Sequence, residues 1–559
     1  MFNLKNLIQE KSIFEITTDG FDLKIYGTIF SKKTIENIST FISSPDTFIK
    51  GDYSFTLKVD NTFYLGSSRS AIFPLYFRRL NNSIIFSNLF NKVVEAHTIN
   101  KLSSEAAFQF IRFEYITDPL TIVEDVYKVP SANVVKVSAD LSIELIECTP
   151  KLSEQKESVQ SMNDFKESVY TAHKNRVTTN SMNTLLLSGG VDSCTSAIVL
   201  KDILKPSKLQ CFNFSTKNAE QDEYPDAKHT ADYLGLKLDR VIVDPYKEVD
   251  LKSLVHKTNF FYSGAIDISA MAEQIGEPTN FFACQDTRLH TPALNALDKF
   301  IFSSKPITRK LFSGAMKSLP NLGESQSILN KVIERGRLAD DLAAYTYKLF
   351  FHQHNIELGS YTPDSLFNTE LKQNLQKTLV NSSASSREIY NRIVELAWHG
   401  QYSDDIQYLT STTRIYSSPC QLPWYDADLA LLSAQLPMKE ATKFVKGRAG
   451  HSSKPKRVNK YLLRHAFKGQ LPNSILYRDK AVCVTNHLYL KGCYRPYIEE
   501  MNTNSKLFNT QAGVELNLSR LFKQHYTNYM NYEIKDYNLA VEMQNLVALE
   551  LYCQVYNLG

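Results

Sequence analysis

The sequence predicts two structural regions, an α+β region of layered antiparallel sheet and then a larger α/β region with a parallel sheet. Residues 1 to about 148 alternate short apolar runs with turns and contain few long helical patterns. Residues 151–161 are polar, as in a linker. From about residue 162, strands and helices alternate, which is the order of a parallel sheet with right-handed crossovers. We therefore expect one domain over 1–150 and a second over 160–559.

The composition excludes several classes of protein. A chain of 559 residues is too long for a single ordinary core. Its 63 basic and 59 acidic residues are too balanced to indicate binding to nucleic acid or to a membrane surface. No apolar run approaches the ~20 residues of a membrane span, and the first residues lack an uninterrupted signal-peptide core. The eight cysteines show no Cys-x-x-Cys pairing, so a cytoplasmic protein is expected.

The first region is predicted to be antiparallel because its apolar runs are short and separated by turns. One helix is expected near residues 103–112, between the strands and a closing strand. The predicted strands cover residues 21–27, 53–59, 62–66, 73–78, 83–87 and 133–138.

The second region is predicted to open with a helix and then run β-α-β-α-β. Its second crossover helix should end at Gly235, a residue that tolerates the left-handed conformation of a helix end. Residues 290 to about 410 are predicted to be mostly helical. The expected order is helix 165–176, strand 184–187, helix 193–204, strand 210–215, helix 222–234 and strand 240–244.

The segment between the first of these strands and its helix is Ser188-Gly-Gly-Val-Asp-Ser193. Two adjacent glycines let the backbone approach a ligand closely, and the free N–H groups at the helix start form an anion site. The serine hydroxyls add donors, and Asp192 is placed to hold a cation. The alternative is a plain Gly-Gly turn with Asp-Ser as a helix N-cap. The order strand, motif, helix favours a pyrophosphate site, and the missing Gly-Lys-Ser/Thr excludes a Walker A loop.

This motif resembles the PP-loop of the N-type ATP pyrophosphatases, which cleave ATP to AMP and pyrophosphate. Further fragments occur in the order of the asparagine synthase family, and the chain resembles that family over nearly its whole length. The resemblance implies an N-terminal Ntn-hydrolase-like αββα sandwich, a C-terminal PP-loop synthetase domain, and use of ATP and Mg²⁺. The matching fragments are Phe212–Thr216 with Asp222 and Glu223, Pro423–Asp426, Lys460–Arg464, Leu471–Ile475 and Arg478–Lys480, together with Phe73–Phe77, Ile84–Ser87 and Thr121–Pro130 in the first region.

The resemblance also implies roles for single residues. Asp192 and Asp286 would be magnesium ligands, although Asp286 could instead be a helix N-cap. Lys480, beside Arg478, would stabilise negative charge during catalysis, the alternative being a solvated lysine. Nucleotide binding would fall to Leu186, Ser188, Gly189, Gly190, Val191, Asp192, Ser193 and Phe214, with Leu186 and Phe214 beside the adenine.

Three departures from the family change the expected chemistry. Working glutaminases carry a nucleophilic cysteine after the first methionine, whereas this sequence has Phe2 and no cysteine before Cys148, so no ammonia should come from glutamine. Phe282-Ala283-Cys284 replaces the family's Gly-x-Gly, and Ala283 cannot move protons, which leaves Arg288 and His290 as nearby candidates. Pro419 and Gln421 replace the glutamate and arginine of the usual Glu-x-Arg-x-Pro-Phe signature.

These features favour an ATP-dependent amide ligase of natural-product biosynthesis, similar to family members without glutaminase activity such as β-lactam synthetase and the lasso-peptide cyclases. Its substrate would be a small molecule or peptide that carries a carboxylate and an amine, with a precursor peptide or accessory protein as a further partner. One alternative is ammonia-dependent asparagine synthesis. Another is a non-catalytic nucleotide-binding descendant that acts as a partner protein. A PP-loop enzyme of tRNA modification is less favoured because basic RNA-binding regions are missing.

Overall fold

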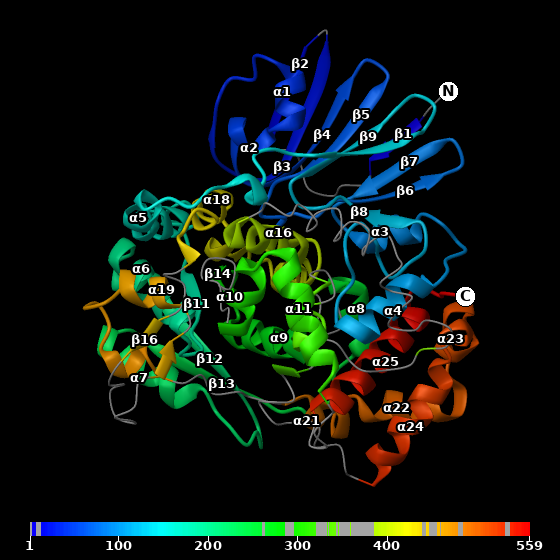
Figure 1. The fold of residues 1–559 in the computed structure, drawn as a ribbon. Helices are drawn as coiled ribbons and strands as arrows, with labels where there is room; N and C mark the ends of the chain where they lie inside the picture. Colours follow the sequence, from blue (N-terminus) through cyan, green and yellow to red (C-terminus); the bar gives the residue numbers. More distant parts are fainter. Residues whose placement is uncertain are drawn as a thin grey trace.

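The computed structural model describes most of the chain (Figure 1). The residues that it describes are 3–6, 13–18, 20–259, 263–284, 296–319, 332–333, 335–341, 345, 358, 385–438, 443–445, 456–458, 460–478, 485–531 and 537–559. Asp286, Arg288, His290 and Lys480 lie outside these ranges, as does Phe2.

The N-terminal region contains two packed sheets with helices on both outer faces. One sheet has six antiparallel strands in the order β10-β9-β5-β4-β3-β2, and the other has four strands in the order β1-β7-β6-β8. The strands are β1 Asn3–Asn6, β2 Phe14–Thr17, β3 Phe21–Lys32, β4 Ile49–Val59, β5 Thr62–Ser67, β6 Tyr76–Leu80, β7 Ser83–Ser87, β8 Val126–Lys128, β9 Asn133–Val137 and β10 Ile143–Glu147. The helices are α1 Ile38–Ser43, α2 Pro45–Phe48, α3 Phe90–Glu95 and α4 Ser104–Phe113.

Alternating side chains build the layers of this sandwich. Val134 of β9 packs with Phe41 of α1 on the outer face of the six-stranded sheet. Val135, one residue later, packs between the two sheets with Phe77 of β6. Tyr76, the neighbour of Phe77, points to the other side and packs against α3 and α4. The order of layers is helix, sheet, sheet, helix, which confirms the predicted αββα sandwich.

The C-terminal region contains a five-stranded sheet, order β13-β12-β11-β14-β15, in which every neighbouring pair is parallel. The strands are β11 Asn183–Leu186, β12 Leu209–Thr216, β13 Leu238–Val243, β14 Asn280–Phe282 and β15 Cys420–Gln421. The first three and the helices between them confirm the predicted β-α-β-α-β order. Gly235 ends α7 with a φ of 66°, as predicted. A separate antiparallel pair is formed by β16 Lys443–Val445 and β17 Lys456–Val458.

Helices cover both faces of the parallel sheet. Phe282 of β14 packs on the face covered by α5, α6 and α7, whereas its neighbour Phe281 packs on the face covered by α9 and α17. The helices are α5 Gln160–Lys174, α6 Val191–Ile203, α7 Tyr224–Leu234, α8 Leu251–Thr258, α9 Ser263–Ile275, α10 Ala296–Ser303, α11 Pro306–Lys317, α16 Ser386–Trp398, α17 Gln401–Ile415, α18 Ala427–Ser433, α19 Tyr461–Ala466, α20 Asn473–Leu476, α21 Asn486–Lys491, α22 Arg495–Asn504, α23 Gln511–Glu515, α24 Leu518–Met530 and α25 Tyr537–Val555.

Buried ion pairs connect the two regions. The guanidinium of Arg176, 4% exposed, contacts Asp52 of β4 and Asp426 before α18, each at 2.8 Å. Lys128 of β8 pairs with Asp118 at 2.7 Å and hydrogen-bonds Ser403 of α17. These contacts join the two regions, and the domain bounds 1–150 and 160–559 stay a prediction.

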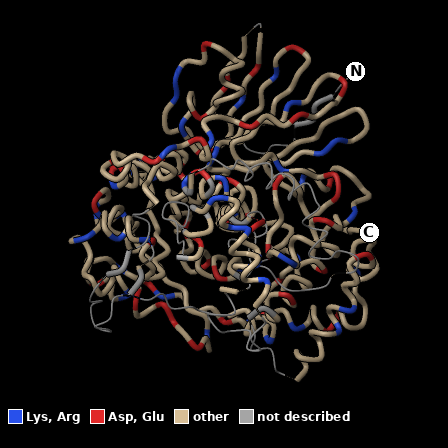
Figure 2. The backbone as a smooth tube through the Cα atoms, in the orientation of Figure 1, with Lys and Arg blue, Asp and Glu red and all other residues tan. Residues whose placement is uncertain are grey.

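Charges of both signs are interspersed along the described backbone (Figure 2). None of the helices in the described ranges is long and apolar enough to cross a membrane.

Candidate functional site

The predicted loop lies between the carboxyl end of β11 and the first turn of α6, as the sequence indicated. Its two serines contact each other, since Ser188 Oγ lies 3.1 Å from Ser193 Oγ. Ser188 Oγ also accepts a hydrogen bond from the Gly190 N–H at 3.3 Å, and Ser193 donates to the Gly190 carbonyl at 3.0 Å. This geometry holds the loop against the start of a 13-residue helix, where backbone N–H groups favour an anion.

Gly189 is required by the geometry of the loop. Its φ is +77°, a region that residues with a Cβ adopt at a cost. A Cβ at this position would lie 2.5 Å from Arg478 Nη2 and 2.8 Å from both the Ala227 nitrogen and the Asp226 Cβ. The loop therefore packs directly against the start of α7, and only glycine leaves room for that contact.

Arg478 lies between the loop and the start of α7. Its guanidinium donates to the Asp226 carbonyl at 3.0 Å and pairs with the Asp226 carboxylate at 3.3 Å. It also contacts the sulfur of Cys194 on α6 at 3.7 Å. These contacts connect α6 and α7 beside the loop. The catalytic roles of Arg478 and Lys480 stay predictions.

The carboxylate of Asp192 contacts the ammonium group of Lys460, a residue that the sequence analysis did not predict as part of the site. Lys460 Nζ lies 2.5 Å from Asp192 Oδ2, and both side chains are about four-fifths buried. Lys460 immediately precedes α19 and has a φ of 54°. The motif Lys460–Arg464 was noted only for its order in the chain, and no local pattern indicated that its lysine meets the loop. The structure therefore places the positive charge of Lys460 beside the N-terminus of α6, against Asp192 in its first turn.

Leu186 and Phe214 lie on neighbouring parallel strands at the edge that carries the loop. Leu186 ends β11, Phe214 lies near the end of β12, and both are partly buried. The side-chain amide of Asn213 donates to the Leu187 carbonyl at 2.9 Å and joins the two strand ends. Ligands of open α/β sheets bind at this carboxyl edge. Partly exposed apolar side chains there suit the flat face of a base.

Ser196 of α6 is the centre of a buried polar network. Its hydroxyl contacts His173 Nε2 at 2.8 Å, the indole nitrogen of Trp424 at 3.0 Å and Cys284 at 3.2 Å. Burial raises the pKa of Cys284 to about 12 and lowers the pKa of His173 to about 4, so both groups are neutral at pH 7. The segment that replaces the family's Gly-x-Gly thus contributes to packing: Phe282 and Ala283 are 1% and 2% exposed.

Of the two predicted magnesium ligands, only one lies within the described residues. Asp192 supplies one carboxylate at the loop, and Asp286 lies outside the described ranges. Within those ranges no group of three or more His, Cys, Asp or Glu side chains could hold a metal ion. A Mg²⁺ held mainly by triphosphate oxygens needs one or two carboxylates, so Asp192 fits such an ion without a complete protein cage.

The family match falls on the part of the chain that contains the glycine loop. Residues 164–277, which include the loop, α6 and α7, match the asparagine synthase family. The chain is 22% identical over 453 residues to asparagine synthetase [glutamine-hydrolyzing] 1 of Bacillus subtilis, a match covering 77% of this chain and 67% of that protein. It is 22% identical over 270 residues to the putative asparagine synthetase [glutamine-hydrolyzing] 2 of Methanocaldococcus jannaschii, covering 46% and 49% of the two chains.

Among solved structures, an NH3-dependent NAD synthetase from Campylobacter jejuni is 17% identical, with a TM-score of 0.18 over 43% of this chain and 95% of that one. A glutamine-dependent NAD+ synthetase from Acinetobacter baumannii is 13% identical, with a TM-score of 0.19 over 41% and 50%. The sequence match over residues 164–277 falls on the strand, loop and helices described above. Residues 164–277 of the chain thus carry a segment of the asparagine synthase family, and the chain is similar to asparagine synthetases beyond that segment.

Proposed function

We propose that this protein is an ATP-dependent ligase that adenylates a carboxylate and transfers the acyl group to an amine. The observation that carries the proposal is the pairing of Lys460 with Asp192 at the glycine loop. The loop N–H groups, the two serine hydroxyls and the lysine together offer donors to a pyrophosphate group. The family match over residues 164–277, which include the glycine loop but not Lys460, supports ATP as the nucleotide.

In the proposed reaction a carboxylate oxygen of the substrate attacks the α-phosphorus of ATP. The bond to the bridging oxygen breaks, and pyrophosphate leaves with the electron pair. Lys460 and the N-terminus of α6 stabilise the charge that develops on it. An amine then attacks the acyl-adenylate carbonyl, AMP leaves, and the amine gives up a proton to complete the amide.

Other residues have proposed parts in this scheme. Asp192, with Asp286, would hold Mg²⁺, which supplies charge neutralisation for the triphosphate. Leu186 and Phe214 would enclose the adenine. Lys480, beside Arg478, would stabilise the transition state of acyl transfer. The roles of Asp286 and Lys480 rest on sequence alone.

The source of the amine separates two versions of the proposal. No cysteine precedes Cys148 in the sequence, and burial raises the pKa of Cys148 to about 12, so this thiol is not a nucleophile for glutamine. We therefore favour an amine already present on the substrate, a small molecule or peptide of natural-product biosynthesis. The second candidate is asparagine formation from aspartate and free ammonia, which the names of the two relatives favour.

The test is exchange of labelled pyrophosphate into ATP, which reports adenylation before any amine reacts. Candidate carboxylates would include aspartate and peptides with a free carboxyl group. Asp192→Asn should abolish exchange, because it removes a charge from a metal ligand with little change in volume. Asp202→Asn, at an exposed position of the same helix, is the matched control and should retain exchange. Formation of ADP instead of AMP would contradict the proposal.

A further inference from the structure

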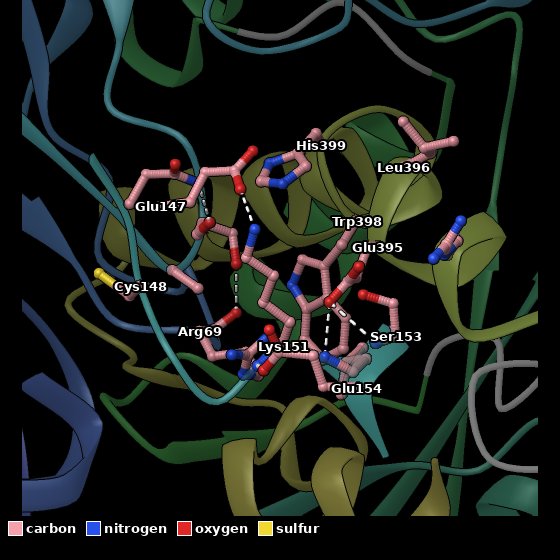
Figure 3. A pocket seen from close by; sticks show the side chains of 15 residues that line it. Arg69, Glu147, Cys148, Lys151, Ser153, Glu154, Glu395, Leu396, Trp398 and His399 are labelled. Atoms are coloured by element: carbon pink, nitrogen blue, oxygen red, sulfur yellow. Dashed lines mark hydrogen bonds and ion pairs between the residues drawn. The ribbon is translucent and has the colours of Figure 1, made fainter. Parts of the chain in front are cut away.

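A cavity lies away from the glycine loop, at the junction of the N-terminal sandwich and α16 (Figure 3). Its volume is about 380 Å³. Three segments line it: the ends of β9 and β10, the connector with the short 3-10 helix Leu152–Glu154, and the last turns of α16. Arg69 completes the wall. None of the loop residues 188–193, nor Lys460, contributes to this cavity.

Four polar atoms in the wall are buried and have no hydrogen-bond partner among the described residues. They are Arg69 Nε, Asn133 Oδ1, Trp398 Nε1 and His399 Nδ1. Arg69 and Asn133 are each 5% exposed, and Trp398 is 2% exposed. Another cavity, lined by Asp52, Arg414 and their neighbours, has no such atom among its lining residues. Buried polar atoms are nearly always paired, so this concentration indicates a partner that the described residues do not supply.

The charges around the cavity are balanced. Three basic and three acidic side chains line it: Arg69, Lys151, Arg392, Glu147, Glu154 and Glu395. Lys151 pairs with Glu147, and Glu395 accepts hydrogen bonds from the Leu152 and Ser153 N–H groups at 2.5 and 3.2 Å. Burial, together with the nearby Lys128 and Arg69, lowers the pKa of His399 to about 4, so the imidazole is neutral at pH 7. A cavity with balanced charge attracts a polyanion such as a nucleotide poorly, whereas it suits a ligand carrying one charge of each sign.

We propose that this cavity binds a free amino acid or another small zwitterion of the same class. The N–H groups of Arg69 and Trp398 donate to its carboxylate, since a guanidinium and an indole are both donors without acceptor capacity. Asn133 Oδ1 and the Glu147 carboxylate accept from its ammonium group. The guanidinium of Arg69 keeps its place through a second bond, from Nη2 to the Pro150 carbonyl at 2.5 Å. The site is separate from the proposed ATP site.

The test uses each standard L-amino acid as a probe of the intact protein, first by thermal shift and then by calorimetry for those that stabilise it. At least one amino acid should bind, whereas acetate, methylamine and inorganic phosphate should each fail to reproduce its effect. Trp398→Phe, which removes only the N–H donor and keeps the aromatic body, should weaken binding about tenfold. Arg69→Gln should weaken it more, because a charge-assisted bond is lost.

Two controls separate this site from the fold and from the proposed ATP site. Arg79→Gln, at an exposed position on β6, should bind the amino acid as the wild type does. Asp192→Asn should also bind it normally, so a failure of the ligase proposal would leave this result untouched. The proposal is overturned if no amino acid binds, if phosphate or acetate alone binds equally well, or if folded Trp398→Phe and Arg69→Gln proteins bind as tightly as the wild type.

Discussion

The ammonium of Lys460 lies 2.5 Å from a carboxylate oxygen of Asp192, although 268 residues separate the two in the chain. Both residues adjoin helix starts, Asp192 in the first turn of α6 and Lys460 just before α19. The pair joins the glycine loop to a late segment of the chain.

Lys460→Met should slow adenylation on the order of 100-fold, equivalent to about 3 kcal/mol of transition-state stabilisation. The methionine keeps the apolar stem and removes the charge that faces the leaving pyrophosphate. Pyrophosphate exchange is the measurement. Lys468→Met, at an exposed position two residues past α19, is the matched control and should be silent. Equal rates in wild type and Lys460→Met would remove this lysine from the mechanism.

Gly189→Ala should abolish ATP binding and destabilise the protein by more than the ~1–2 kcal/mol of left-handed strain. The added Cβ meets backbone and side-chain atoms of α7 at 2.8 Å. Gly235→Ala measures the cost of the backbone conformation alone, because Gly235 also has a positive φ but a Cβ there would have no atom within 4 Å. Calorimetric ATP titration and urea unfolding of both variants measure the difference. If both lose the same stability and both bind ATP, the close contact at the loop is unimportant.

The free energy of unfolding should fall with acidification between about pH 6.5 and pH 4, partly through His173. Burial lowers the pKa of this imidazole from 6.5 to about 4, so over that range the unfolded chain binds a proton that the folded protein does not. Stability is fully present above pH 6.5, and the loss by pH 4 amounts to about 3 kcal/mol for this residue.

Urea unfolding at a series of pH values compares the wild type with His173→Gln, which keeps hydrogen-bonding groups toward Ser196 and cannot titrate. A shallower slope is expected in the variant. His229→Gln, at an exposed position on α7, should keep the wild-type slope. A slope that is unchanged in His173→Gln would show that other groups, such as the buried His399, carry the acid sensitivity.

Incubation with glutamine should release no glutamate. Burial, reinforced by the nearby Asp46 carboxylate, raises the pKa of Cys148 to about 12, and the thiol therefore stays protonated at neutral pH. The measurement is glutamate formed in the presence of ATP, with Cys148→Ala as the comparison. Stoichiometric glutamate that disappears in the alanine variant would show that Cys148 acts as a nucleophile after all.

The sequence by itself determined the local parts of this protein. Three leucines, two glycines and a run of apolar residues at helical spacing lie within about 20 residues, and each acts on its immediate neighbours, so strand, loop and helix followed directly. The short apolar runs of the first region, separated by turns, likewise indicated its layered sheets. Asp286 and Lys480 were assigned from the resemblance to the asparagine synthase family, and they stay predictions because they lie outside the described residues.

Only the tertiary structure decided the features that depend on distant partners. Strands β14 and β15 have three and two residues, too short for a periodic signal, and exist because they pair with β11 and with each other. Lys460 meets Asp192 only because α19 packs beside α5. The unpaired atoms of Arg69, Asn133 and Trp398 converge from two regions of the chain. Such contacts are set by the packing of whole elements, which no window of neighbouring residues encodes.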